Sequence, residues 1–183
     1  MQLETPRLIL RPWKDSDLEP MAALNADSQV MEFFPNVMTR EETAAMIERI
    51  KARYASDGFC FWAADEKETG NFIGFIGLGR PSIEAHFIPC VEIGWRLAHA
   101  YWGKGYAPEG AQAVLKDGFE RINLDEIVAM TSAINAKSIR VMEKISMHRD
   151  AKDDFMHPIF EDGHHLKPHV LYRITEKEWR QKL

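Results

Sequence analysis

The chain has 183 residues, and its 23 Lys and Arg against 28 Asp and Glu give a formal net charge of −5 at pH 7. Hydrophobic residues make up 45%, which is ordinary for a globular protein, and the length suits one domain over residues 1–183. An acidic total argues against a protein whose main task is to bind nucleic acid or an anionic membrane.

The sequence predicts neither a secretory signal nor a membrane helix. The first residues include Glu4 and Arg7 and have no apolar core. The most apolar run, Phe72–Leu78, is far shorter than the ~20 residues that a membrane helix needs. The two cysteines, Cys60 and Cys90, form no CxxC pair, so we expect two buried free thiols and a cytoplasmic protein.

The first half of the chain predicts a strand, two helices and a meander of three strands. The second helix has the strongest start signal, because Thr39 and Glu42 fit the S/T-x-x-E capping box. The expected elements are a strand at Leu8–Trp13, helices at Asp15–Asn25 and Arg40–Ala55, and strands at Phe59–Asp65, Asn71–Gly79 and Pro89–Leu97.

The second half alternates between helices and strands. Together the two halves predict an α+β fold, with a mostly antiparallel sheet and one strand–helix–strand unit in its middle. The expected elements are helices at Tyr106–Ile122 and Asn135–Ile145, strands at Asp125–Thr131, His148–Phe155 and Val170–Ile174, and a helical turn at Glu176–Gln181.

The segment with the most chemistry is the loop that contains Gly103 and Gly105. It follows a strand and precedes a helix, so its backbone N–H groups and the positive end of the helix can bind phosphate, with Lys104 adding a charge. A Walker A loop needs Ser or Thr after the Lys, and a Rossmann fingerprint needs GxGxxG early in a parallel sheet, so neither fits. The local pattern leaves a phosphate site and a plain glycine-rich connection as alternatives.

Three motifs in order carry a family resemblance. They are Val91–Leu97 (VEIGWRL), Tyr101–Glu109 (YWGKGYAPE) and Asn135–Lys144 (NAKSIRVMEK), with further similarity at Leu3–Pro12, at Asp154–Phe155 and at His169–Arg173. Together they resemble the GNAT acetyltransferases, in particular the RimJ/RimL-like branch, which includes acetyltransferases of ribosomal-protein N-termini. The resemblance implies a mixed, mostly antiparallel seven-stranded sheet flanked by helices, with a splayed central strand pair.

The same resemblance implies acetyl-coenzyme A as cosubstrate, with no metal. Its pantetheine arm would enter between the splayed strands, its pyrophosphate would bind the glycine loop, and its thioester would lie near Ile93–Trp95. The residues implied to bind it are Trp95, Arg96, Leu97, Trp102, Gly103, Lys104, Gly105, Tyr106, Ala107, Asn135 and Ser138. Two positions depart from the family pattern, since Ala100 stands where Arg or Gln is usual and Ser146 where Gly is common.

Two residues are candidates for catalysis. Glu92 lies in the strand that would face the thioester and is the candidate base, working through a water; a structural strand carboxylate is the alternative. By resemblance, Ser138 would hydrogen-bond or protonate the leaving sulfur. Asn135 shares its helix face and is also a natural N-cap.

The acceptor side is less defined. Phe33, Phe34 and Trp62 are candidates for its wall, with aromatic core as the commoner explanation. In the loop with His157, His164, His165 and His169, a metal site would need His165 and His169 on one helix face, but Gly163 and Pro168 disfavour a helix there and no cysteine joins them. We expect this loop to shape the acceptor mouth or to pack.

We therefore expect an N-acetyltransferase that transfers an acetyl group to a primary amine, either a protein N-terminus or a small molecule, by direct attack in a ternary complex. The alternative is a catalytically weak acyl-coenzyme A sensor module with the same fold. We expect neither nucleic acid nor membrane as a partner, and both a monomer and a homodimer remain open.

Overall fold

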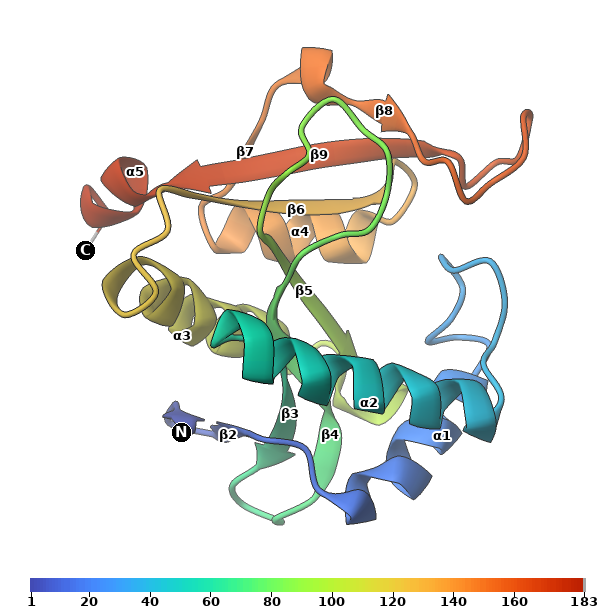
Figure 1. The fold of residues 1–183 in the computed structure, drawn as a ribbon, viewed down its shortest axis with the longest axis vertical. Coiled ribbons are helices and arrows are strands. Elements are labelled where there is room, and N and C mark those ends of the chain that lie inside the picture. The colour runs from blue at the N-terminus through green and yellow to red at the C-terminus, as the bar shows by residue number, and fades with distance from the viewer. Residues whose placement is uncertain (183) are drawn as a thin grey trace.

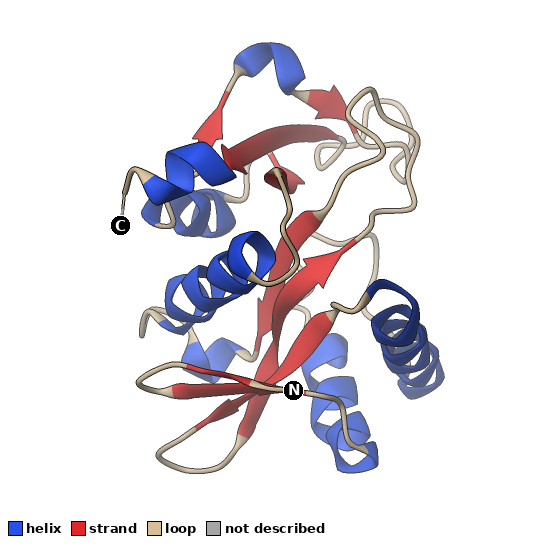
Figure 2. Cartoon of the chain, turned by 60° about the vertical axis from the view of Figure 1, so that its left-hand side comes forward, coloured by secondary structure: helices blue, strands red, loops and turns tan. Residues whose placement is uncertain are grey.

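The computed structural model describes residues 1–182, which form one nine-stranded sheet with helices on both faces (Figures 1 and 2). The strand order is β1-β2-β3-β4-β5-β6-β9-β7, and β8 also pairs with β9. All pairs are antiparallel except β5 with β6, in the middle of the sheet. This is the α+β arrangement that the sequence predicts.

The element bounds follow the sequence expectations closely. The strands are β1 Leu3–Glu4, β2 Leu8–Arg11, β3 Phe61–Glu66, β4 Phe72–Gly79, β5 Glu92–Leu97, β6 Glu126–Ser132, β7 His148–Arg149, β8 Phe155–Met156 and β9 Pro168–Thr175. The helices are α1 Leu18–Ala26, α2 Arg40–Asp57, α3 Tyr106–Glu120, α4 Ala136–Lys144 and α5 Glu176–Arg180. Short 3₁₀ turns cover Asp15–Asp17, His99–Tyr101 and Ala151–Asp153.

Two differences raise the strand count from the expected seven to nine. The sequence analysis missed β1, a two-residue strand that pairs with β2. The strand expected at His148–Phe155 is divided into β7 and β8 by a 3₁₀ turn at Ala151–Asp153. The turn forms because the Asp150 side chain accepts a hydrogen bond from the Lys152 N–H, which competes with an extended backbone.

The helix α2 begins and ends as its sequence predicts. The Thr39 side chain accepts from the Glu42 N–H, and the Glu42 carboxylate accepts from the Thr39 N–H at 2.7 Å, so both halves of the capping box form. Gly58 ends the helix at φ +75°, a conformation that glycine adopts without strain.

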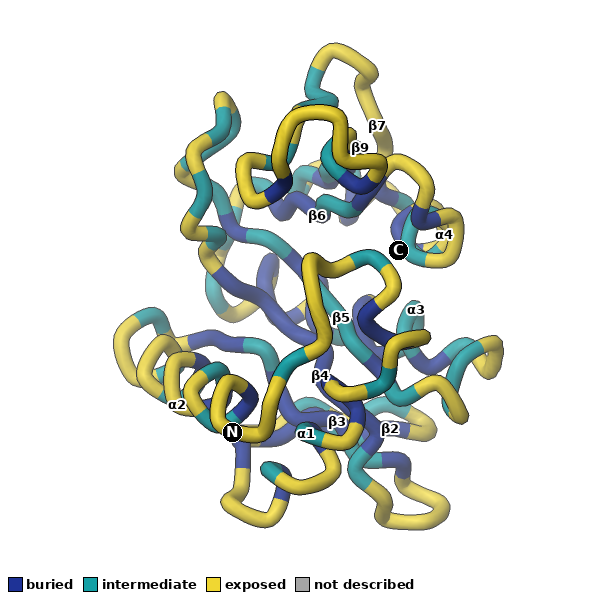
Figure 3. The backbone as a smooth tube through the Cα atoms, turned by 90° about the vertical axis from the view of Figure 1, so that its right-hand side faces the viewer, coloured by how far each residue is buried: buried dark blue, intermediate teal, exposed yellow. Residues whose placement is uncertain are grey.

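The two faces of the sheet are covered differently. The helix α3 packs on one face, where Gly110 leaves room for Ile76 and Gly118 leaves room for Ile127. On the opposite face, α1 and α2 lie side by side (Figure 1), and Asn25 of α1 reaches β5. The central strands are the most buried part of the chain, as Figure 3 shows. Among residues 1–182, no helix has the length and apolar character to cross a bilayer.

Candidate active site

The parallel strands β5 and β6 separate almost as soon as they meet. Their ladder contains one residue pair, Glu92 with Val128, and the Val128 N–H donates to the Val91 carbonyl at 3.0 Å. Beyond this pair, β5 runs steeply away from β6 (Figure 1), so the two facing strand edges form no further ladder pairs with each other. This confirms the splayed central pair and leaves backbone groups at two facing strand edges open to a ligand.

A cavity of about 1170 Å³ occupies this gap. It extends from the loop before α2 and from α2 itself, past β5, to the glycine loop, the end of β6 and α4. Most residues expected at the site line it: Glu92, Trp95, Arg96, Leu97, Trp102, Gly103, Gly105, Tyr106, Ala107, Asn135 and Ser138. Lys104 is exposed and instead places its Nζ 5.0 Å from the centre of the Tyr101 ring. The structure thus brings the three sequence motifs to one cavity.

The glycine loop has the geometry of an anion site. Gly103 and Gly105 have φ of +74° and +83°, and Gly105 is the N-cap of α3. The N–H groups of Tyr106 and Ala107 open the helix and have no intrahelical acceptor. Apart from Gly103 itself and its neighbours Trp102 and Lys104, no residue among 1–182 lies within 4 Å of the place where a Cβ on Gly103 would stand, so a ligand can approach the backbone closely there.

The N-terminal segment holds this loop in place, which the sequence analysis did not predict. Arg7 donates from Nε to Glu109 Oε2 at 2.6 Å and from Nη1 to the Lys104 carbonyl at 2.9 Å. Thr5 donates to the other Glu109 oxygen at 2.6 Å. Burial alone would raise the pKa of Glu109, but the hydrogen bonds from Thr5 and Arg7 lower it below its usual value. The only sequence signal was the resemblance over Leu3–Pro12, which assigned these residues no role.

The helix α4 adds cations beside the glycine loop. Lys137, Arg140 and Lys144 all line the cavity, and Lys137 Nζ lies 4.5 Å from the centre of the Trp102 ring. Asn135 caps this helix, since its Oδ1 accepts from the Ser138 N–H at 3.2 Å and its Nδ2 donates to Thr131 at 2.9 Å. These two bonds occupy both ends of the Asn135 amide, which supports the N-cap role.

Ser132 of β6 and Ser138 of α4 both line the cavity. Ser138 is partly buried, and its position on α4 depends on the Asn135 cap. The Ser132 Oγ is buried and has no hydrogen-bond partner within residues 1–182. An unpaired buried hydroxyl costs about 1–3 kcal/mol, a cost that a hydrogen bond to a polar ligand in the gap would remove.

Glu92 and Arg96 lie on the face of β5 that α1 covers, because side chains alternate along a strand. Burial raises the pKa of Glu92 to about 7, and the nearby Arg53 opposes that rise. Trp95 lies on the opposite face, paired with Ile76. The carboxyl group of Glu92 therefore exchanges its proton near neutral pH, as a general base requires.

The aromatic residues expected at the acceptor wall divide between the cavity and the core. Phe33 and Phe34 line the cavity, and Phe34 is 38% exposed. Trp62 is buried at 1% exposure and packs its ring against Tyr54 at 5.0 Å, so the core explanation holds for it.

The histidine loop packs aromatic rings at the cavity rim. His157 and His169 line the cavity with ring centres 4.7 Å apart, and His164 stacks on Phe160 at 4.9 Å. Burial and the proximity of His169 lower the pKa of His157 to about 4, so this ring is neutral at pH 7. Within residues 1–182, no three His, Cys, Asp or Glu side chains come together in a way that could hold a metal ion.

The two cysteine thiols, Cys60 and Cys90, both have raised pKa values. Cys60 is buried, which raises its pKa to about 12. Cys90 is half-buried rather than buried as expected; burial first, and then Glu92 and Glu126, raise its pKa to about 11. Neither thiol forms the thiolate that a nucleophilic cysteine needs at neutral pH.

Comparisons with known proteins agree with this geometry. Residues 7–148 match the family model described as an acetyltransferase (GNAT) domain. The chain is 31% identical over 180 residues to YnaD, an uncharacterized N-acetyltransferase of Bacillus subtilis, covering 98% of this chain and 99% of that protein. It is also 31% identical to an FsC-acetyl coenzyme A-N(2)-transacetylase of Aspergillus fumigatus, covering 97% and 77% of the two chains.

Solved acetyltransferase structures share the fold of this chain. A GNAT-family acetyltransferase from Bacillus anthracis superposes with a TM-score of 0.80 at 30% identity, covering 97% of this chain and 100% of that one. RimL, a ribosomal alpha-N-protein acetyltransferase solved in complex with coenzyme A, shares the fold with a TM-score of 0.77 at 16% identity, covering 97% and 99%. The match of sequence, fold and cavity places this chain in the GNAT acetyltransferase family.

Proposed function

We propose that the protein transfers an acetyl group from acetyl-coenzyme A to a primary amine by direct attack in a ternary complex. The observation that carries the proposal is the cavity itself, which joins the glycine loop to the α1-covered face of β5 through the gap between β5 and β6. A thioester entering from one side would meet an amine entering from the other at Gly94, in the middle of β5.

The residues of the gap fit coenzyme A. The glycine loop would hold the pyrophosphate through backbone N–H groups, and Lys137, Arg140 and Lys144 would add charge for the remaining phosphate. The facing edges of β5 and β6 would pair with the pantetheine amides, with the orphan Ser132 hydroxyl beside them.

The chemistry needs few protein groups. The amine nitrogen attacks the thioester carbonyl, the new C–N bond forms, the C–S bond breaks, and the thiolate leaves. Glu92 would take the proton that the amine loses, through a water, and Ser138 would donate a hydrogen bond to the departing sulfur. The raised pKa values of Cys60 and Cys90 favour direct transfer over a covalent enzyme intermediate.

A thiol-release assay tests this function. Acetyl-coenzyme A is incubated with amines and short peptides, free thiol is detected, and acetylated products are identified by mass spectrometry. Turnover on at least one amine supports the proposal. Binding of coenzyme A in calorimetry without turnover on any amine would favour the sensor module, and absence of coenzyme A binding would refute both.

A further inference from the structure

Arg96 lines the cavity and has no negatively charged partner within the described chain. Its Nη1 donates to Asn25 Oδ1 at 2.7 Å, while its Nε is buried and has no hydrogen-bond partner within the described chain. The guanidinium lies 4.1 Å from the Phe34 ring centre and 5.5 Å from that of Phe75. No carboxylate of residues 1–182 forms an ion pair with it. Burial lowers its pKa to about 10, which still leaves the group charged at neutral pH.

Arg96 is only partly buried, and the chain pairs a more deeply buried arginine, Arg11, with carboxylates. Arg11 is 8% exposed, and it binds Asp17 on one side at 2.7 Å and Asp65 on the other at 2.5 Å. A buried charge without a partner is costly, which is why proteins normally pair such groups. The Arg96 guanidinium has no carboxylate partner among residues 1–182, which indicates that its counter-charge arrives with a ligand.

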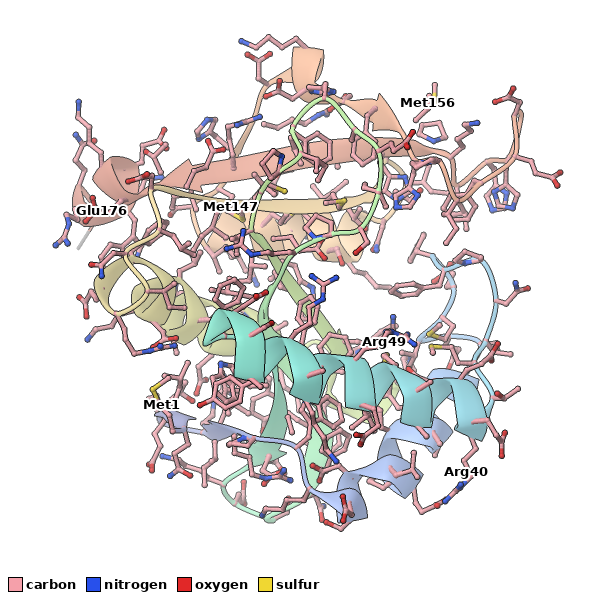
Figure 4. The ribbon with its side chains drawn as sticks, in the orientation of Figure 1. Met1, Arg40, Arg49, Met147, Met156 and Glu176 are labelled. Carbon is pink, nitrogen blue, oxygen red and sulfur yellow. The ribbon has the colours of Figure 1, made fainter. Side chains whose placement is uncertain are left out.

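The charge around Arg96 supports an anionic ligand. Arg49 projects from α2 on the cavity side (Figure 4), and Arg53 lines the cavity one turn further along. Two carboxylates line the cavity: Asp57, which lies 3.6 Å from Arg80 in an ion pair, and Glu92. Although the chain carries a net charge of −5, this half of the cavity is cationic, so it attracts anions and repels polyamines.

The position of Arg96 on β5 relates this anion to the reaction. It shares a face with Glu92 and lies two residues beyond Gly94, which is roughly 7 Å along a strand. An amine placed at Gly94 for attack would thus bring a group a few bonds away to the guanidinium, and planar bidentate pairing suits a carboxylate.

We propose that the acceptor is a small amine that also carries a carboxylate, as in a free amino acid, and that Arg96 binds this carboxylate and sets the acceptor preference. The proposal rests on the proposed acetyl transfer and adds the chemical class of the acceptor.

The test compares each of the eighteen common amino acids that have a primary amine and no thiol, which leaves out proline and cysteine, with its own primary amide in the thiol-release assay, with spermidine as a further acceptor. The wild type should prefer acids over the matched amides by roughly tenfold or more in kcat/KM. Arg96→Gln should bring this ratio close to one, and Arg96→Lys should restore only part of it because the lysine lacks the fork. The matched control, Arg180→Gln, changes an exposed arginine of α5 and should leave the ratio unchanged.

Two results would overturn the proposal while leaving acetyl transfer intact: amides or spermidine accepted as well as the acids, or an acid preference that persists in Arg96→Gln. A second readout does not depend on turnover. N-acetyl amino acids should bind the coenzyme A-loaded protein in calorimetry more tightly than their amides, and this difference should vanish in Arg96→Gln. Equal binding of acid and amide would refute the assignment, even if no amine were acetylated.

Discussion

Replacing Glu92 by glutamine tests both its burial and its role as a base. The rise of its pKa from 4.5 to about 7 means that ionising it in the folded protein costs up to about 3 kcal/mol more than in the unfolded chain. Below the unfolded pKa the carboxyl is neutral in both states and adds no such cost. Between the unfolded and the folded pKa, the free energy of unfolding falls as pH rises, and above pH 7 the full cost of ionising Glu92 is present. The partial exposure of Glu92 and the nearby Arg53 make 3 kcal/mol an upper bound.

Urea denaturation at pH 5 and pH 8 measures this effect. The free energy of unfolding of Glu92→Gln minus that of the wild type should be larger at pH 8 than at pH 5 by about 2 kcal/mol, because only the wild type pays to ionise the buried carboxyl. Glu68→Gln, which changes an exposed carboxylate in the β3–β4 turn, is the matched control and should give the same difference at both pH values. In the transfer assay, the wild-type rate should rise with pH through a midpoint near 7. Glu92→Gln should lose this limb and fall roughly 100-fold.

The burial argument is refuted if Glu92→Gln changes stability equally at pH 5 and pH 8. The base assignment is refuted separately if the rate keeps its rise near pH 7 in the variant. A structural carboxylate, the alternative role for Glu92, would give the stability effect without the loss of the kinetic limb.

The remaining predictions concern the phosphate loop, the leaving group and one strained cap. Gly103→Asp should abolish coenzyme A binding in calorimetry, whereas Gly103→Asn, which suits φ +74° equally and carries no charge, should retain more of it; equal loss in both would remove charge as the cause. Arg7→Gln should weaken coenzyme A binding roughly tenfold without touching the cavity, and unchanged affinity would show that the loop holds itself. Ser138→Ala should lower kcat more than coenzyme A affinity, and equal turnover would assign the residue to packing. Ser146→Gly should raise the free energy of unfolding by about 1 kcal/mol, because Ser146 has φ +66°; a lower melting temperature would contradict this.

Local signals explain which parts of the fold the sequence predicts. The capping box at Thr39 fixed the start of α2, and the glycine pair located the anion loop, because both features act within a few residues. The family pattern, which commonly has glycine at position 146, also pointed to a strained cap at Ser146. The structure shows φ +66° at this residue.

Contacts between distant residues explain what the sequence does not predict. The Arg7–Glu109 brace joins positions 102 residues apart, and neither residue carries a local signal for the other. The lack of a carboxylate partner for Arg96 is also not visible in the sequence, because it depends on which side chains the fold places within reach of its guanidinium. Strand alternation would have separated Arg96 from Trp95, and it was a signal available from the sequence alone.

The single ladder pair between β5 and β6 has a mechanical consequence. The sheet is in effect two half-sheets, residues 3–97 and 126–175, joined edge to edge by one residue pair. What ties them together is α3, which packs on Ile76 in one half and Ile127 in the other, and the β4–β5 loop, whose Phe87 ring meets Phe155 at 4.9 Å. A ligand that bonds to both strand edges would act as a missing strand, so its binding should slow amide hydrogen exchange across the seam, on both half-sheets at once.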